Sequence, residues 1–357
     1  MAKVVVLGGC GGIGSVAART LVALGGFDQL VVADVRAEEA ARFAASLGAP
    51  NVTSAGFDAR SPESLASVLA GADVVCNCVG PFYEFGPPIL EAAIRARVNY
   101  VDVCDDLAPT RTMLADALGQ YLAWKRWMNW FLVIGPQPED KLFAEALKRS
   151  AKRFGAKIVE EREFKYDPGS RRADGGFEQI QQQIPGFMQN AKEHDIVMVA
   201  DEGQLFGEYF PYRTWQARPV AGSAGLVASS WHPALELWGG TQFQNRFKKL
   251  GNRIMRNIDY DAWLAARVVG EAATRTKSAK YADLAQYIRS PEFEVAAFQG
   301  VKTTFRAWNG QLREPLIVGT PKMLVSVSPQ PGFLHQFSEL DTLGLDKPET
   351  KCKAYAQ

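Results

Sequence analysis

The feature that most constrains this chain is a glycine-rich turn directly after an apolar run near its start. Residues 4–7 have the length and β-branched content of a buried parallel strand, and Gly8-Gly9-Cys10-Gly11-Gly12-Ile13-Gly14 follows them. Apolar residues at helical spacing come next: Ile13, Val16, Ala17, Leu21 and Leu24. Strand, glycine turn and helix in this order predict a loop that holds a dinucleotide.

Each glycine of the pattern has a separate task in such a loop. Gly9 allows the tight turn, Gly11 lets the backbone approach a pyrophosphate, and Gly14 lets the helix pack closely on the strand. The phosphates would lie at the helix N-terminus, where free N–H groups and the helix dipole favour negative charge. The alternative is a purely structural turn. The cofactor-binding candidates in the loop are Gly9, Cys10, Gly11, Gly12, Ile13 and Gly14.

An acidic residue stands where a nucleotide ribose would lie. A second apolar strand over residues 30–33 ends at Asp34, whose carboxylate can accept hydrogen bonds from the adenosine ribose hydroxyls of NAD. Arg36 is two positions further on and can instead face the 2′-phosphate of NADP. The cofactor is therefore predicted as NAD or NADP, and the choice stays open.

Residues 1–106 alternate strand and helix throughout, which predicts an α/β fold with a parallel sheet and helices on both faces. Ligands of such sheets bind beyond the carboxyl ends of the strands. The residues that follow the third, fourth and fifth predicted strands therefore join the candidates, and they are Asp58, then Gly80, Pro81 and Phe82, then Asp105 and Asp106.

Three segments of this part resemble one family. They are the glycine loop, Asn77-Cys78-Val79-Gly80-Pro81-Phe82 and Asn99-Tyr100-Val101-Asp102-Val103-Cys104-Asp105-Asp106. Together they are similar to the NAD(P)-binding domain of saccharopine dehydrogenase-like proteins over residues 1–112. The resemblance implies a pyridine-nucleotide oxidoreductase whose nicotinamide lies near the loop after the fourth strand. In that family a separate α/β substrate domain follows, and this chain departs from it.

Composition limits the function classes. A chain of 357 residues suggests two domains, and a net charge of +1 gives no electrostatic case for nucleic acid or an anionic membrane surface. No apolar run is long enough for membrane insertion, and Met1-Ala2-Lys3 leads directly into the first strand, so we expect no signal peptide and a cytoplasmic location. Five cysteines and three histidines indicate neither a disulfide framework nor a metal site.

The sequence changes character near Thr112. Residues 113–130 are predicted as a helix that buries Trp124, Trp127 and Trp130, since spacing of three places side chains on one helix face. A nucleic-acid or membrane surface is the alternative interpretation. A second series of strands and helices follows, including an amphipathic helix over residues 259–276 with Trp263 inward. The tail from Gln330 is predicted to lie on the surface.

This second part resembles a different family. The segments are Gly135-Pro136-Gln137-Pro138-Glu139-Asp140, Phe210-Pro211-Tyr212-Arg213-Thr214-Trp215, Ser230-Trp231-His232-Pro233, Gly332-Phe333-Leu334-His335-Gln336 and Glu339-Leu340-Asp341-Thr342-Leu343-Gly344. They are similar to type I periplasmic solute-binding proteins of ABC transporters, in particular one encoded with pyrroloquinoline quinone-dependent alcohol oxidation, over residues 110–353. In that family a signal peptide and a first lobe come before this region, and we expect neither of them in this chain.

The two resemblances meet near residues 109–114 and predict a chimera of two three-layer αβα domains. Its expected parts are a Rossmann domain over residues 1–110, a periplasmic-binding-protein-like domain over 111–330 and a surface tail over 331–357. Whether the helix around Trp263 packs on the first sheet or the second is left open.

Two functions follow from these resemblances, and both take a small molecule. One is an NAD(P)-dependent oxidoreductase and the other a non-catalytic solute-binding protein. The protein could form a homo-oligomer with either function, and the sequence does not decide this. Asp105 and Asp106 are the candidate catalytic residues because a carboxylate can contact a cationic substrate amine, with a helix cap as the alternative. Other side chains weighed for ligand binding, each against an ordinary structural role, are Lys125, Arg171, Arg172, His232 and His335.

Overall fold

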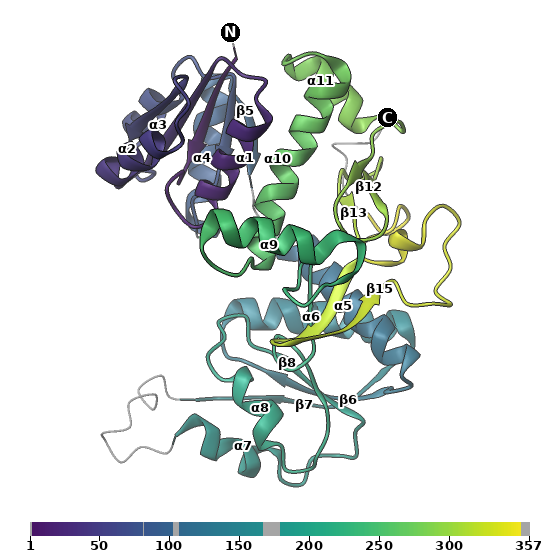
Figure 1. Ribbon diagram of the computed structural model, residues 1–357. Helices are drawn as coiled ribbons and strands as arrows, with labels where there is room; N and C mark the ends of the chain where they lie inside the picture. Colours follow the sequence, from purple (N-terminus) through teal and green to yellow (C-terminus); the bar gives the residue numbers. More distant parts are fainter. Residues whose placement is uncertain (1, 81, 103–106, 167–178, 351–357) are drawn as a thin grey trace. The chain divides into compact units, whose positions relative to one another are not determined.

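The computed structural model describes residues 2–80, 82–102, 107–166 and 179–350 (Figure 1). The chain forms two compact units, and both are discontinuous in sequence. The first comprises Met1–Asp105 and Leu237–Leu312, and the second comprises Asp106–Glu236 and Arg313–Gln357. The chain therefore passes from one unit to the other after Asp105, after Glu236 and after Leu312.

The first unit contains a 5-stranded parallel sheet in the order β3-β2-β1-β4-β5. Its strands are β1 (Lys3–Leu7), β2 (Gln29–Asp34), β3 (Val52–Gly56), β4 (Val74–Asn77) and β5 (Asn99–Asp102). The strand order reverses between β1 and β4, so the carboxyl ends of these two strands border the crevice where such sheets bind ligands.

Helices cover both faces of this sheet. They are α1 (Gly14–Leu24), α2 (Ala37–Ser46), α3 (Pro62–Leu69) and α4 (Phe82–Ala96). Val5 and Leu7 pack with residues of α3 and α4, whereas Val6 packs with residues of α1 and α2. Alternate residues of one strand thus enter two separate cores, which is the three-layer αβα arrangement predicted from the sequence.

Residues 237–312, the returning segment, add further helices and a small sheet to the first unit. This segment holds α9 (Gly240–Gly251), α10 (Asn257–Thr276), α11 (Tyr281–Arg289) and a small sheet of β11 (Val295–Ala296), β12 (Lys302–Phe305) and β13 (Leu312–Arg313). Helix α10 lies beside α1 (Figure 1), and a Cβ atom placed on Gly270 would lie 2.5 Å from Leu24 Cδ1. The helix around Trp263 therefore packs in the first unit.

The second unit is built on a 4-stranded parallel sheet in the order β7-β6-β8-β9. The strands are β6 (Asn129–Ile134), β7 (Lys157–Glu163), β8 (Ile196–Ala200) and β9 (Val220–Gly222). Helices α5 (Leu107–Trp124) and α6 (Pro138–Phe154) share one core cluster, and α7 (Ile180–Met188) and α8 (Phe210–Arg213) share another with residues of the same strands. The sheet is thus covered on both faces.

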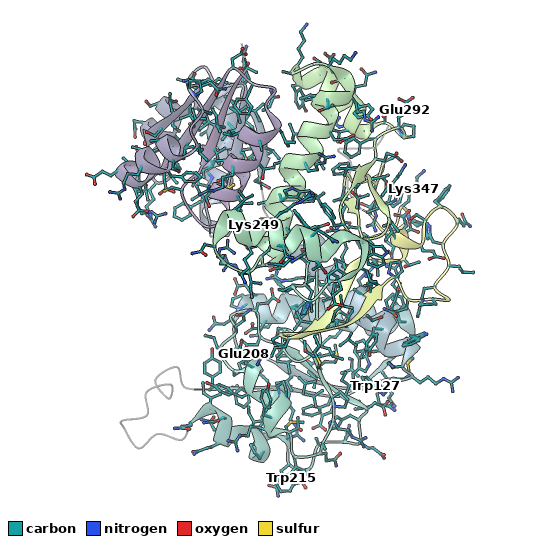
Figure 2. The ribbon with its side chains drawn as sticks, in the orientation of Figure 1. Trp127, Glu208, Trp215, Lys249, Glu292 and Lys347 are labelled. Carbon is teal, nitrogen blue, oxygen red and sulfur yellow. The ribbon has the colours of Figure 1, made fainter. Side chains whose placement is uncertain are left out.

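An antiparallel sheet completes the second unit. Its strands are β10 (Val227–Ser229), β14 (Leu316–Thr320) and β15 (Met323–Ser328). The second unit also contains the 3-10 helices η2 (Gly207–Tyr209) and η4 (Glu339–Thr342), whereas η3 (Leu237–Gly239) belongs to the first unit. Within the motif around α8, Phe210 is fully buried, whereas Trp215 is 56% exposed and lies at the periphery of its unit (Figure 2).

The structure divides the chain differently from the contiguous domains expected at 1–110 and 111–330. Residues 237–312 lie within the expected second domain but belong to the first unit, because α10 packs against α1. The predicted surface tail is wrong for its central part. Asp341 and Leu343 are fully buried, and Asp341 accepts hydrogen bonds from Arg313 Nε at 2.8 and 3.0 Å.

The predicted tryptophan helix is also wrong. Helix α5 ends at Trp124, Arg126 adopts a left-handed backbone with φ of 63°, and Trp130 lies on strand β6. Trp130 is fully buried, but Trp124 is 50% exposed, and Lys125 Nζ lies 4.8 Å from its ring centroid. The three rings therefore share no helix face.

Candidate functional site

The glycine loop joins β1 to α1 at the carboxyl edge of the first sheet. Gly8 has a φ of 69°, a backbone conformation that favours glycine, and it turns the chain away from the strand. The turn is fixed by backbone hydrogen bonds from Gly9 N to Ala33 O at 2.9 Å and from Gly11 N to Gly8 O at 3.0 Å. The loop is therefore held against β2 before α1 begins at Gly14.

Two of the loop glycines are required by packing within the protein itself. A Cβ atom on Gly14 would lie 2.1 Å from Gly8 O, and one on Gly9 would lie 2.8 Å from Val32 Cγ1. Both distances are too short for a real contact, so each position needs glycine even without a ligand. These two residues alone fit a structural turn as well as a nucleotide site.

Gly11 and Gly12 are less crowded than Gly9 and Gly14. A Cβ atom on Gly11 would meet only Gly8 O, at 3.1 Å, and one on Gly12 would meet only Arg256 Nη2, at 3.6 Å. Gly12 is exposed and Gly11 is half-buried. The side of the loop that faces away from the core is therefore open for an anion at the N-terminus of α1.

Asp34 ends strand β2 and is only 4% exposed. Its Oδ1 atom accepts hydrogen bonds from Arg36 N at 3.1 Å and from Arg36 Nε at 3.3 Å. Burial by itself raises the pKa of Asp34, but hydrogen bonds from Cys10 and Arg36 outweigh it and hold that pKa below its ordinary value. Asp34 is thus an ionised acceptor at neutral pH.

Arg36 links Asp34 to the glycine loop. It pairs with Glu39 at 2.7 Å, and its Nη2 atom lies 3.6 Å from Cys10 Sγ. The side chain is 52% exposed, so solvent or a ligand can reach the guanidinium. The structure brings the predicted residues Cys10, Asp34 and Arg36 together.

Cys10 gives a test of this arrangement. Burial and the neighbouring Asp34 carboxylate raise the pKa of the Cys10 thiol from 9.0 to about 11. At pH 8 its thiolate fraction is then about 100-fold smaller than at the ordinary pKa, so we expect iodoacetamide to modify it about 100-fold more slowly than in the urea-unfolded chain. Mass spectrometry of the peptide that contains Cys10 measures this rate. Equal rates in the folded and unfolded chains would contradict the assigned environment.

The loop after β4 borders the same edge of the sheet. Asn77 is fully buried, its Nδ2 donates to Tyr100 Oη at 2.9 Å, and its Oδ1 accepts from Val79 N at 3.0 Å. Cys78 N donates to Leu7 O at 2.9 Å, which places this loop beside the end of β1. A Cβ atom on Gly80 would meet none of the described residues within 4 Å. Gly80 is exposed, in the loop that follows the strand next to β1.

Among the remaining predicted site residues, the structure places Asp58 away from the loop. The exposed Asp58 accepts a hydrogen bond from Arg60 N at 2.9 Å in the turn before α3. Asp58 follows β3, which is separated from β1 by β2. Since neighbouring strands lie about 5 Å apart, β3 is about 10 Å from the strand that leads into the glycine loop. Pro81, Asp105, Asp106, Arg171 and Arg172 lie outside the described residues, as does the side chain of Phe82.

The histidines of the second unit have structural partners. His232 Nε2 lies 2.8 Å from Thr320 O, and its Nδ1 accepts from Ala234 N at 3.1 Å. His335 Nε2 lies 3.2 Å from Asp346 Oδ2. Across the described residues, no group of three or more His, Cys, Asp or Glu side chains is arranged to hold a metal ion.

Acidic side chains at the carboxyl edge of the second sheet are used by the backbone. The buried Asp140 accepts from Gln137 N at 3.1 Å and from Glu202 N at 2.7 Å. Asp201 accepts from the backbone N–H groups of residues 205–207. These carboxylates shape loops, so the first unit holds the better-defined candidate site.

Comparison with known proteins agrees with this placement. Residues 4–126 match the saccharopine dehydrogenase NADP binding domain. The match includes the glycine loop, Asp34, Arg36 and Gly80, and it leaves residues 127–357 outside. Carboxyaminopropylagmatine dehydrogenase of Synechocystis sp. is 32% identical over 107 residues, which are 29% of this chain and 26% of that protein. This chain thus matches about a quarter of its relative's length.

The fold as a whole resembles periplasmic binding proteins of type I. An ABC transporter substrate-binding protein from Sphaerobacter thermophilus has a TM-score of 0.64 at 13% identity, covering 92% of this chain and 98% of that one. A leucine-, isoleucine-, valine-, threonine- and alanine-binding protein from Brucella ovis has a TM-score of 0.63 at 13% identity, covering 92% of both chains. These likenesses show a shared fold. Both parts of the predicted chimera are therefore supported.

One residue of the loop's surroundings was missed by the sequence reasoning. Arg256 precedes α10, far from the matched domain in sequence, yet its guanidinium reaches Gly12. No motif marks this position.

For the described residues, no helix is both long enough and apolar enough to cross a membrane.

Proposed function

We propose that this protein binds a nicotinamide dinucleotide at the glycine loop and acts as an oxidoreductase. The observation that carries the proposal is the open outer side of Gly11 and Gly12 at the N-terminus of α1, beside the buried, ionised Asp34. A structural turn needs Gly9 and Gly14, but it does not need room beside Gly11. The match of residues 4–126 to an NADP-binding domain supports the same conclusion.

Each group at this edge has a defined task. The N–H groups at the start of α1 would hold the pyrophosphate, where the helix dipole favours negative charge. The Asp34 carboxylate would accept hydrogen bonds from the adenosine ribose, and the backbone at Gly80 would border the nicotinamide. When bound, the nicotinamide supplies hydride transfer. Cys10, as a neutral thiol, adds no negative charge beside the phosphates.

Nucleotide binding is expected to stabilise the protein. A ligand present at 100 times its dissociation constant stabilises the folded state by about 2.7 kcal/mol, which thermal unfolding detects as a higher Tm. We expect this shift, and quenching or enhancement of NAD(P)H fluorescence, with NADH, NADPH or both. Adenosine without phosphates is the control ligand. Unchanged Tm and fluorescence with both nucleotides at millimolar concentration would overturn the proposal.

The preference between the two nucleotides is expected to depend on Arg36. Its guanidinium is half-exposed beside Asp34 and can turn to a 2′-phosphate, with a charge-assisted hydrogen bond of about 1.5–3 kcal/mol. Arg36→Ala should therefore weaken NADPH binding about tenfold or more while leaving NADH binding nearly unchanged. Fluorescence titration with both nucleotides measures the two dissociation constants. An equal loss for both would place Arg36 away from the 2′-position.

A second function is favoured by the fold of the whole chain. The two solved binding proteins given above each align with 92% of this chain. We infer a non-catalytic solute-binding protein as the alternative, with a small molecule as ligand. A thermal-shift screen of amino acids and organic acids, with and without NADH, separates the two. A Tm increase caused by a solute without any nucleotide supports the alternative.

The cytoplasmic location and the formation of a homo-oligomer remain predictions from the sequence.

A further inference from the structure

Arg256 reaches the glycine loop from a part of the chain that the NADP-binding domain match does not include. The residue immediately precedes α10, and its Nη2 atom would lie 3.6 Å from a Cβ atom placed on Gly12. Gly12 is the exposed residue between Gly11 and the first turn of α1. A guanidinium therefore stands at the side of the loop left open for an anion.

The packing of two helices fixes this position. Leu24, at the end of α1, fits against Gly270 of α10, where a Cβ atom would lie 2.5 Å from Leu24 Cδ1 and Leu24 would have to move. The starts of both helices meet at Gly12 and Arg256, and their later turns meet at Leu24 and Gly270. The helices thus run in the same direction, with both N-termini at the loop, where their dipoles add.

The guanidinium of Arg256 is only weakly paired with a carboxylate of the protein. The carboxylate with which it pairs among the described residues, Asp259, is already bound by Arg253, whose Nη1 and Nη2 donate at 2.5 and 2.6 Å. Asp259 also accepts from Arg256 N at 2.9 Å, whereas Arg256 Nε lies 3.7 Å from that carboxylate, too far for a hydrogen bond. The Arg256 side chain is 62% exposed and can turn to a ligand without leaving Asp259 unpaired.

We propose that Arg256 binds the pyrophosphate of the dinucleotide held by the glycine loop, an inference that rests on the proposed function. Guanidinium groups suit this task because their planar N–H groups match phosphate oxygens in pairs. Arg256 thereby supplies a cation at the start of α1, whereas Arg36 stands beside Asp34 and Glu39, on the side of the loop proposed for the ribose. The returning segment then completes the nucleotide site.

The test compares Arg256→Ala with a matched arginine on the same helix. Arg275→Ala is the control, because Arg275 is also 62% exposed and also pairs with one carboxylate, that of Glu271. It lies about 28 Å along α10 from Arg256. Fluorescence titration of the full chain should show about 10- to 100-fold weaker binding of both NADH and NADPH in Arg256→Ala and less than about twofold change in Arg275→Ala. Arg256→Lys should restore part of the affinity, since it keeps the charge.

Three outcomes would separate the possible failures. If the unaltered protein binds neither nucleotide, the proposed function fails and this inference fails with it. If it binds both, and a folded Arg256→Ala binds equally well, only the role of Arg256 is overturned. A loss confined to NADPH would move Arg256 to the 2′-phosphate and overturn the pyrophosphate assignment. Urea unfolding of each variant checks that the first unit stays folded.

Discussion

Gly11→Val is expected to abolish nucleotide binding and to leave the first unit folded. Gly11 does not have a positive φ, so a valine backbone is not strained there, and its Cβ would meet only Gly8 O at 3.1 Å. The two γ-methyl groups would instead fill the space at the start of α1 where the pyrophosphate would lie. We expect the dissociation constants of NADH and NADPH to rise by about 100-fold or more, equivalent to about 2.8 kcal/mol.

Two further glycine variants make this result interpretable. Gly14→Ala should lower both stability and binding, because its Cβ would lie 2.1 Å from Gly8 O. Gly186→Val, in α7 of the second unit, should change neither, since its Cβ would meet nothing within 4 Å. Calorimetric titration and thermal unfolding measure the two quantities separately. A folded Gly11→Val protein with unchanged affinity would remove the pyrophosphate from the glycine loop.

Asp341→Ala is expected to destabilise the second unit by about 3–5 kcal/mol. The carboxylate is fully buried and accepts two contacts from Arg313 Nε, at 2.8 and 3.0 Å. The Arg313 side chain is only 16% exposed, so the substitution would leave a guanidinium largely buried without its main counter-charge. The free energy of unfolding in urea measures the loss.

A surface acid provides the control for that prediction. Glu145 pairs with Lys148 at 3.0 Å, but its side chain is 70% exposed, so Glu145→Ala should cost less than about 1 kcal/mol. Both acids belong to the second unit, and both are replaced by the same residue. If Asp341→Ala is as mild as Glu145→Ala, residues 341–343 behave as the solvated tail that the sequence suggested.

Local patterns explain why the first sheet was predictable. The strand expected at residues 30–33 is β2 (Gln29–Asp34), and the alternation of strand and helix expected over residues 1–106 includes α3, which begins at Pro62. Ser61 Oγ accepts from Ser64 N at 3.1 Å, as an N-cap does. In each case the signal lies within a few residues of the element it determines, so no knowledge of distant contacts was needed.

The errors arose where the signal was weak or distant. Helix α5 ends near Arg126, a left-handed residue that is neither glycine nor asparagine, so the sequence offered no ordinary stop signal before Trp127. The burial of Asp341 depends on Arg313, a partner 28 positions away along the chain. Arg256 likewise reaches Gly12 only because α10 packs on α1. Pairings of this kind come from tertiary structure, which a single sequence does not display.

The contact between α10 and α1 also bears on how such a protein can arise and be dissected. Recognisable kinship to the NADP-binding domain ends at residue 126, whereas the compact body that contains that domain's sheet is completed only by residues 237–312. A fragment cut at residue 126 would keep the whole fingerprint yet uncover Leu24 and the flank of α1. The sequence match and the compact units thus divide this chain at different places, and a fragment made at the boundary of the match would lack the helix that packs against α1.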